Sequence, residues 1–110
     1  MVILLTSPAD KTSIQKASED LGGYVKFVVD LKREVMTIGG LRHLEGEQLL
    51  LQDGSHQSDL WGGGVDLESK EIDYESMINI RSPGNPSREA LDPNIRAQMK
   101  AVVDKLFVKT

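Results

Sequence analysis

Two ionisable residues near the middle of the chain, His43 and Glu47, stand four positions apart. On a helix this spacing puts both side chains on one face, where they could reach one metal ion or one substrate proton. A carboxylate beside an imidazole raises the pKa of the imidazole and orients the ring for proton transfer. His56, Asp53 or Asp59 could complete a metal site, because zinc needs at least three protein ligands.

Metal binding is the weaker of these two interpretations. The chain has no cysteine, and no second histidine accompanies His43 on the expected helix. In the plainer alternative, His43 and Glu47 are a surface pair on a helix and His56 is a loop residue. We therefore predict no metal site and no cofactor, and we retain these three residues as candidates for acid–base catalysis.

A second group of polar residues, further along the chain, could bind an anion. Arginine side chains and the free N–H groups at the start of a helix are typical anion ligands. The candidate ligand-binding residues are Asn79, Arg81, Asn85, Ser87, Arg88 and, on an earlier segment, Trp61. The alternative is structural: Asn85 forms a turn, Ser87 caps a helical turn, and the arginines are solvated or paired with acidic neighbours.

Trp61 precedes three consecutive glycines at positions 62–64. A lone tryptophan beside glycines is typical of a core residue or an interface anchor. The glycines lack the lysine and the spacing of a phosphate-binding loop, and they indicate a bulge, a bend or the close approach of another backbone to a strand. Exposed sheet edges in so small a protein favour self-association, and we expect a homodimer.

The elements that position these residues follow from the hydrophobic periodicity. In chain order we expect a short strand at 2–5, a helix at 8–21, strands at 24–31 and 34–38, a helix at 41–52, strands at 60–67 and 72–81, and a helix at 93–107. Ser7 and Asp92 are the expected caps of the first and last helices, and each precedes a proline. The segment 72–81 alternates most regularly between apolar and polar residues, which predicts a strand with one buried face.

The central helix is expected to pack through Leu41, Leu44 and Leu51, and the run Leu49-Leu50-Leu51 predicts that it is buried on much of its circumference. Gly46 is its weak point, since glycine costs up to ~1 kcal/mol relative to alanine in a helix interior. The predicted fold class is α+β: two β-hairpins form an antiparallel sheet, and the central helix and the N- and C-terminal helices pack on one face of it. We expect residues 1–110 to form a single domain.

The composition excludes several functional classes. The 110 residues are 39% hydrophobic and 27% charged, which is typical of a globular domain rather than a disordered chain. The N-terminal apolar run is too short for a membrane span and lacks the basic start of a signal peptide, and together with the absence of cysteine this favours a cytoplasmic protein. The net charge of −4 argues against nucleic acid as a partner, although residues 81–110 carry a net charge of +3.

Two blocks of the sequence carry a family resemblance. The first block consists of Gly39-Gly40, His43, Glu47, Leu49-Leu50, Asp53-Gly54-Ser55, Gln57 and Leu60-Trp61-Gly62. The second consists of Ser76-Met77-Ile78-Asn79-Ile80-Arg81, Asn85, Ser87-Arg88-Glu89 and Arg96. Together they resemble a small prokaryotic protein family of about this length that is catalogued only as a domain of unknown function. The resemblance covers most of the chain and implies no catalytic residue, cofactor or partner.

The residues favour a ligand-binding or regulatory module with a site near the central helix and the segment 79–88. A small anionic ligand would sit with Arg81 or Arg88, and His43 and Glu47 would lie nearby. We expect no membrane partner, because the chain offers no apolar stretch long enough for a span.

Two other functional classes stay open. A small enzyme would use His43 and Glu47 as an acid–base pair or as metal ligands on a small or phosphate-bearing substrate. It would need a concave pocket in which these side chains converge, whereas a binding module can present a flat face. A protein-interaction subunit would instead expose an apolar patch that includes Trp61 or Met77.

Overall fold

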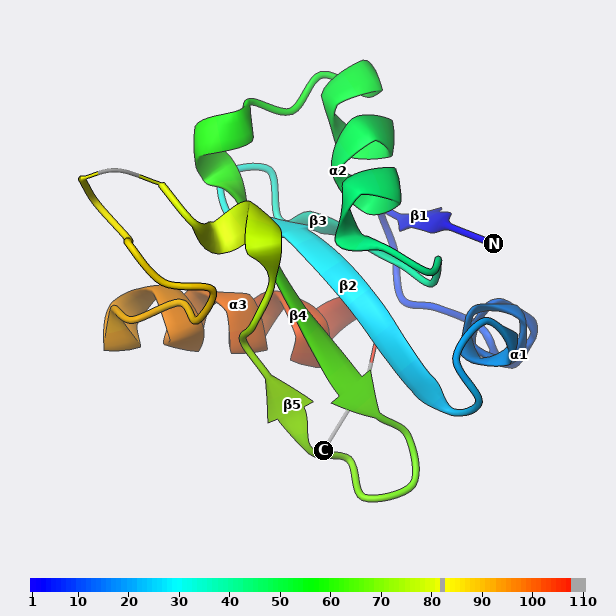
Figure 1. The fold of residues 1–110 in the computed structure, drawn as a ribbon. Helices are drawn as coiled ribbons and strands as arrows, with labels where there is room; N and C mark the ends of the chain where they lie inside the picture. Colours follow the sequence, from blue (N-terminus) through cyan, green and yellow to red (C-terminus); the bar gives the residue numbers. More distant parts are fainter. Residues whose placement is uncertain (82, 108–110) are drawn as a thin grey trace.

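The centre of the molecule is one antiparallel sheet of five strands. The computed structural model describes residues 1–81 and 83–107. The strands lie in the spatial order β1-β3-β2-β4-β5 (Figure 1). They are β1 (Ile3–Leu5), β2 (Tyr24–Asp30), β3 (Val35–Ile38), β4 (Leu60–Asp66) and β5 (Ile72–Asp73). The predicted α+β class and the hairpin of β2 and β3 are therefore confirmed.

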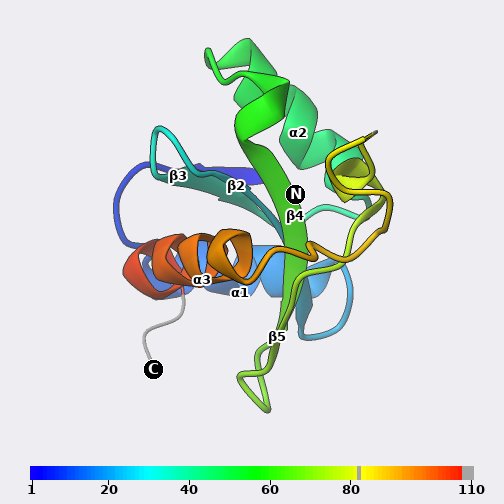
Figure 2. The ribbon, with the colours of Figure 1, turned by 90° about the vertical axis from the view of Figure 1, so that its left-hand side faces the viewer.

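Helices cover both faces of the sheet (Figure 2). On one face lie α1 (Lys11–Glu19) and α3 (Pro93–Leu106), and on the other lies α2 (His43–Gln52). The first layer surrounds Phe27 and the second surrounds Val28. The expectation that all three helices share one face is wrong. Neighbouring residues of a strand point to opposite faces, and β2 buries Phe27 and Val29 on one face and Val28 on the other, so helices cover both faces.

The helix caps agree with the sequence in part. Asp92 caps α3 as predicted, accepting a hydrogen bond from the backbone N–H of Asn94 at 2.8 Å. α1 begins later than expected because Asp10, not Ser7, caps it. The Asp10 carboxylate accepts from the N–H of Ser13 at 2.7 Å. None of the helices in the described residues has the length and apolarity that a membrane span requires.

α2 is buried on one narrow side, and not on much of its circumference or on the side of Leu41, Leu44 and Leu51, as the sequence predicts. Leu41, Leu44 and Leu51 are 59%, 48% and 40% exposed. The helix contacts the sheet through Gly46 and Leu50, which are both buried. A Cβ at Gly46 would overlap side chains of β2 and β3, so the missing side chain is what lets the helix approach the sheet. Gly46 is therefore a packing contact and not a weak point.

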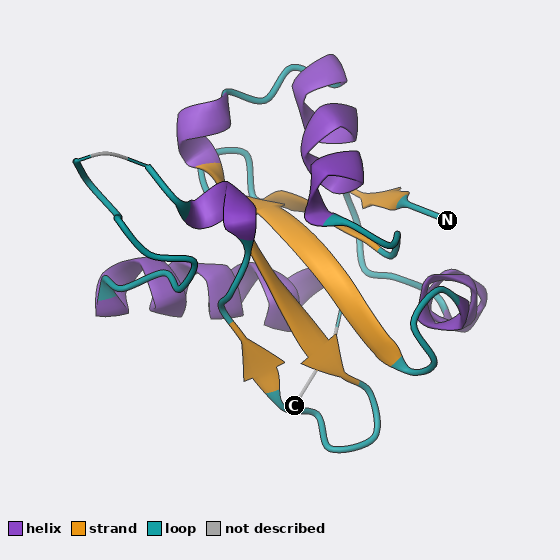
Figure 3. Cartoon of the chain, in the orientation of Figure 1, coloured by secondary structure: helices purple, strands orange, loops and turns teal. Residues whose placement is uncertain are grey.

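The segment 72–81 does not form the long strand that its alternation predicts. Only Ile72–Asp73 pairs with β4, and the chain then turns into a short 3-10 helix, η2 (Met77–Asn79) (Figure 3). The hydroxyl of Ser76 caps η2 by accepting from the N–H of Ile78 at 3.2 Å. Local side-chain capping therefore overrides the two-residue periodicity here.

Candidate functional site

A hollow of about 400 Å³ lies on the α2 side of the sheet, and we call it the His43 pocket. Its lining comprises Tyr24, Lys26, His43, Asp73, Glu75, Ser76, Met77 and Arg88. These side chains come from segments that are far apart in the sequence, and most of them are polar or charged. The pocket is therefore a product of the tertiary fold.

His43, the first residue of α2, is half-buried against β4. Its Nε2 lies 2.7 Å from the carbonyl oxygen of Gly63, and because a carbonyl can only accept, Nε2 carries the proton. Burial lowers the pKa of His43 and the charge of Lys26 adds to this, although the Gly63 contact opposes it. The ring is therefore neutral at neutral pH, and Nδ1 is an acceptor that has no partner among the described residues.

The three glycines of β4 allow this close approach. A Cβ on Gly62 would stand 2.7 Å from Cβ of Ser76 and 2.9 Å from Cδ2 of His43. A Cβ on Gly63 would overlap the backbone carbonyl of Asp73. The predicted close approach of another backbone is confirmed. The predicted bulge is wrong, because β4 pairs residue by residue with β2 across the glycines.

Tyr24 and Asp73 form one wall of the pocket. The phenol of Tyr24, which lies over Gly64, donates a hydrogen bond to Oδ2 of Asp73 at 2.5 Å. The other carboxylate oxygen of Asp73 accepts from the N–H of Glu75 at 3.1 Å. Burial raises the pKa of Tyr24 far above its usual value, and the Asp73 carboxylate adds to the effect. Tyr24 is therefore a fixed hydrogen-bond donor at neutral pH.

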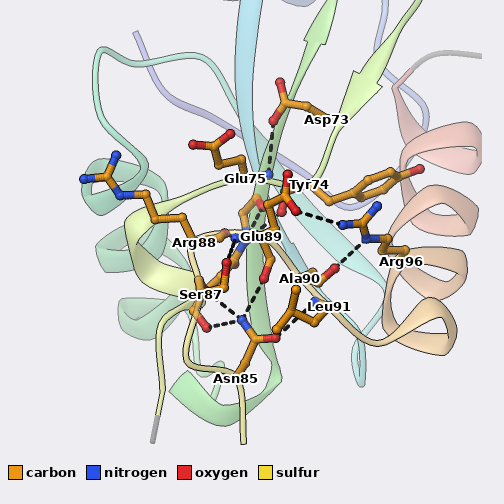
Figure 4. Close-up of polar contacts among 12 residues, drawn as sticks. Asp73, Tyr74, Glu75, Asn85, Ser87, Arg88, Glu89, Ala90, Leu91 and Arg96 are labelled. Carbon is orange, nitrogen blue, oxygen red and sulfur yellow. Dashed lines mark hydrogen bonds and ion pairs between the residues drawn. The ribbon is translucent and has the colours of Figure 1, made fainter.

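Three charged side chains at the pocket, Lys26, Glu75 and Arg88, make no ion pair within the described residues. Glu75 and Arg88 come from two neighbouring segments and extend to the same side, whereas Tyr74 and Arg96 lie on the other side (Figure 4). The formal charges of the pocket balance once Asp73 is included, but Asp73 already accepts two hydrogen bonds. Lys26 and Arg88 thus keep unused donors, and the carboxylate of Glu75 keeps unused acceptors.

The structure separates the candidate catalytic residues. Glu47 lies one turn along α2 from His43, and no hydrogen bond joins the two within the described residues. The carboxylate of Glu47 acts instead on Arg81, where it opposes the lowering of the pKa that burial causes. His56 is exposed and precedes the short helix η1 (Gln57–Asp59), outside the lining of the pocket.

The candidate metal ligands around His43 do not gather. Asp53 is paired with Arg33 at 2.6 Å, and Asp59 is half-buried at the end of η1. Over residues 1–81 and 83–107, no three histidine, aspartate or glutamate side chains are placed to hold one metal ion. The ligand set that the spacing suggested is therefore absent from this part of the chain.

Two candidate ligand-binding residues, Asn79 and Asn85, are buried and bind backbone groups. Oδ1 of Asn79 accepts from the N–H of Gly62 at 2.8 Å, and Nδ2 donates to the carbonyl of Gly62 at 2.9 Å and to two further carbonyls. Nδ2 of Asn85 donates to three carbonyls, and Oδ1 accepts from the N–H of Leu91 (Figure 4). These amides hold the 79–91 loop in place.

Arg81 and Trp61 are tied to each other. The Arg81 guanidinium lies 3.9 Å from the centre of the Trp61 ring. It also donates to the backbone carbonyls of Ser58, Leu60 and Ile78. Trp61 is 8% exposed and belongs to the core, so the core alternative for this residue is confirmed. The two terminal nitrogens of Arg81 are thus engaged, whereas its Nε is buried without a partner among the described residues, and Arg81 does not line the His43 pocket.

Of the predicted anion-binding residues in the segment 79–88, Arg88 alone lines the His43 pocket. Ser87 accepts from the N–H of Glu89 at 3.1 Å. The chain after Ser87 bridges to Glu75 and does not form the predicted helical turn.

Most of the pocket lining escaped the sequence analysis. The missed residues are Tyr24, Lys26, Asp73, Glu75 and Ser76. One signal was available: Lys26 is the only charge in the otherwise apolar run from residue 24 to residue 29. A charge within a mostly buried strand needs either a partner or access to solvent, which points to a surface hollow.

Comparison with known proteins gives a family without an activity. A family model described as a protein of unknown function (DUF5674) matches residues 3–106, which confirms the resemblance that the two sequence blocks carry. No curated protein and no solved structure matches the chain. The matched range contains the whole lining of the His43 pocket.

Proposed function

The chain belongs to the DUF5674 family of proteins of unknown function, and we propose that it is a binding module for a small polar ligand that carries an anionic group. The ligand would occupy the His43 pocket, with its anion between Lys26 and Arg88. One observation carries the proposal: two cations without an ion-pair partner in the described residues border a concave, polar hollow. Charge-assisted hydrogen bonds from such cations are the strong ones available to a ligand.

The size and polarity of the hollow support a small ligand. Its volume of about 400 Å³ falls in the usual range for ligand pockets. Asp73 is already hydrogen-bonded, so Glu75 is the remaining acceptor for a donor group on the ligand. His43 would respond to the anion, because a negative charge beside the neutral ring favours its protonated form. Nδ1 would then donate to the ligand.

The two histidines of the chain provide the test, because His43 lines the pocket and His56 does not. The protein would be titrated with acetate and, separately, with inorganic phosphate at constant ionic strength. We expect saturable shifts of the His43 imidazole NMR signals, and unchanged His56 signals. Equal shifts at both histidines, or none at either, would refute the proposal.

A matched pair of variants locates the anion. Arg88→Gln removes one of the two pocket cations and should weaken anion binding about tenfold. Lys32→Gln removes a cation from the exposed turn after β2, and the affinity should stay at the wild-type value. If Arg88→Gln binds acetate and phosphate as wild type does, the anion site is not at Arg88.

The alternative is a small enzyme that uses His43 in acid–base catalysis on a small or phosphate-bearing substrate. It is favoured by the single tautomer of His43, which leaves Nδ1 available as a base. In this case Asp73 and Glu75, rather than Glu47, are the carboxylates at the site. Hydrolysis of p-nitrophenyl acetate or p-nitrophenyl phosphate that is lost in His43→Gln would favour the enzyme over the binding module.

We propose further that the protein acts as a homodimer in the cytoplasm. Within the described residues, β1 and β5 each have one edge that no strand of the sheet covers, and such edges can pair with a second copy. The absence of cysteine suits a reducing compartment. Size-exclusion chromatography with light scattering should give the mass of two chains, and a monomer at micromolar concentration would contradict this.

A further inference from the structure

The His43 pocket continues into a second hollow of about 370 Å³ between α2 and η2, which we call the Leu44 hollow. Its own lining residues are Arg42, Leu44 and Ile78. It shares Lys26, His43, Ser76 and Met77 with the His43 pocket. A ligand bound at this shared wall therefore has room to extend into either hollow.

The two hollows differ in polarity. Leu44 and Ile78 join the shared Met77 to give the Leu44 hollow an apolar wall. The residues that line the His43 pocket alone are Tyr24 and the charged Asp73, Glu75 and Arg88. Leu44 is 48% exposed and Met77 is 63% exposed. Leu44 is not part of the contact between α2 and the sheet, which Gly46 and Leu50 make. Exposed apolar side chains that border a hollow are typical of a ligand site.

The charge of the Leu44 hollow has one sign. Lys26 and Arg42 line it, and its lining contains no carboxylate, although the chain as a whole is acidic. The guanidinium of Arg42 has no ion-pair partner among the described residues. A ligand that fits this hollow therefore combines a hydrocarbon surface with a negative charge.

We propose that the ligand is an amphipathic carboxylic acid. Its hydrocarbon group lies against Leu44 and Met77, and its carboxylate binds at the shared wall beside Lys26 and His43. This inference rests on the proposed function, because it specifies the anion that the His43 pocket binds. It adds that affinity comes from the apolar part of the ligand as well as from the charge.

Three probes separate these contributions: acetate, 4-methylpentanoate and the uncharged 4-methylpentanamide. Each would be titrated at constant ionic strength and followed by the His43 NMR signals, with His56 as the internal reference. We expect 4-methylpentanoate to bind about tenfold more tightly than acetate, because a partly open hollow buries part of its hydrocarbon. The amide should bind about tenfold more weakly than 4-methylpentanoate, because it lacks the charge.

Two leucines of α2 make a matched pair of variants. Leu44→Gln removes the apolar wall and should reduce the advantage of 4-methylpentanoate over acetate to less than threefold. Leu51→Gln changes a leucine on the same helix that is 40% exposed and lies outside the hollow, and the advantage should persist. Both residues are exposed, so both variants should fold, which a circular dichroism spectrum would verify.

The outcomes distinguish this inference from the proposed function. If acetate and 4-methylpentanoate shift His43 with equal affinity, or if Leu44→Gln keeps the full advantage of the longer acid, the amphipathic ligand is refuted and anion binding stands. If no probe shifts His43 selectively, the proposed function fails and this inference fails with it. A tenfold advantage that Leu44→Gln abolishes and Leu51→Gln keeps supports both.

Discussion

Two polar clusters meet at η2, and they differ in the partners of their side chains. The buried amides of Asn79 and Asn85 bind backbone groups with both their oxygen and their nitrogen atoms. In the His43 pocket, the side chains of Lys26 and Arg88 make no hydrogen bond to the described residues, and His43 makes one. Both clusters consist of residue types that are common in binding sites. The unused hydrogen-bonding capacity, and not the residue type, therefore identifies the candidate site.

The asparagine cluster has a structural cause. The chain after β5 makes few ladder hydrogen bonds, so its buried carbonyl and N–H groups need partners from side chains. An asparagine amide donates and accepts at once, which suits this task. The charged groups of the His43 pocket line an open hollow, where solvent can satisfy them. The predictions below test this division, starting with the largest expected effect.

Asn79→Ala should destabilise the fold by about 3 kcal/mol or more, because it leaves several buried backbone groups without partners. Urea unfolding followed by the fluorescence of Trp61 measures the change. Asn94→Ala, at an exposed position of α3, is the control and should stay within about 0.5 kcal/mol of wild type. Equal effects of the two substitutions would contradict the division.

Gly62→Ala should destabilise the fold by about 2 kcal/mol, because the new methyl group would press on Ser76 and on the His43 ring. It should also shift the His43 NMR signals. Gly84→Ala is the control, since no atom of the described residues, apart from its two chain neighbours, lies within 4 Å of a Cβ at that position. Unchanged His43 signals in Gly62→Ala would mean that the glycine does not set the position of the ring.

His43 should make stability depend on pH. The groups that face its ring are Lys26, Asp73 and the carbonyl of Gly63. Burial lowers the pKa of His43 in the folded state. Below about pH 6.5 the unfolded chain therefore binds the proton more readily than the folded protein, and the stability decreases as the pH is lowered. Between pH 8 and pH 5.5 the unfolding free energy of wild type should decline more than that of His43→Gln. If the two proteins lose the same unfolding free energy over this pH range, the pKa of His43 is the same in the folded and the unfolded state.

Arg88→Gln should have the smallest effect on stability, within about 0.5 kcal/mol, because only the backbone of this residue takes part in the asparagine cluster. The same variant should lose anion affinity, which is the opposite pattern to Asn79→Ala. Urea unfolding and the acetate titration, performed on one preparation, make the comparison. A large loss of stability in Arg88→Gln would place its side chain in the structural cluster.

Local signals in the sequence determined several elements. Asp92 followed by a proline specified the start of α3, and alternating apolar residues specified β2. Such patterns depend only on residues that are close in the sequence, so they can be recognised without the structure. Together they predict the α+β class. The glycines of β4 also predicted that another segment lies close to this strand, but they did not predict which residues do so.

Other features depended on contacts between distant segments. The side of α2 that faces the sheet was decided by Gly46, whose missing side chain matters only once Thr37 and Val28 lie beneath it. The predicted 72–81 strand is interrupted by η2, where the side chain of Asn79 binds the backbone of Gly62 on β4. No local rule contains these contacts, so periodicity alone predicts the wrong outcome at both places.

The sequence by itself thus determined the class of fold, the start of α3 and the position of β2, and it selected His43 as a candidate site residue. The tertiary structure alone decided which groups surround His43. The hydrogen-bond partner of His43 is the carbonyl of Gly63 and not the predicted Glu47, and Lys26 and Arg88 line the same hollow. The physical reason is that a binding site consists of side chains joined in space, and spacing along one helix predicts only the neighbours on that helix.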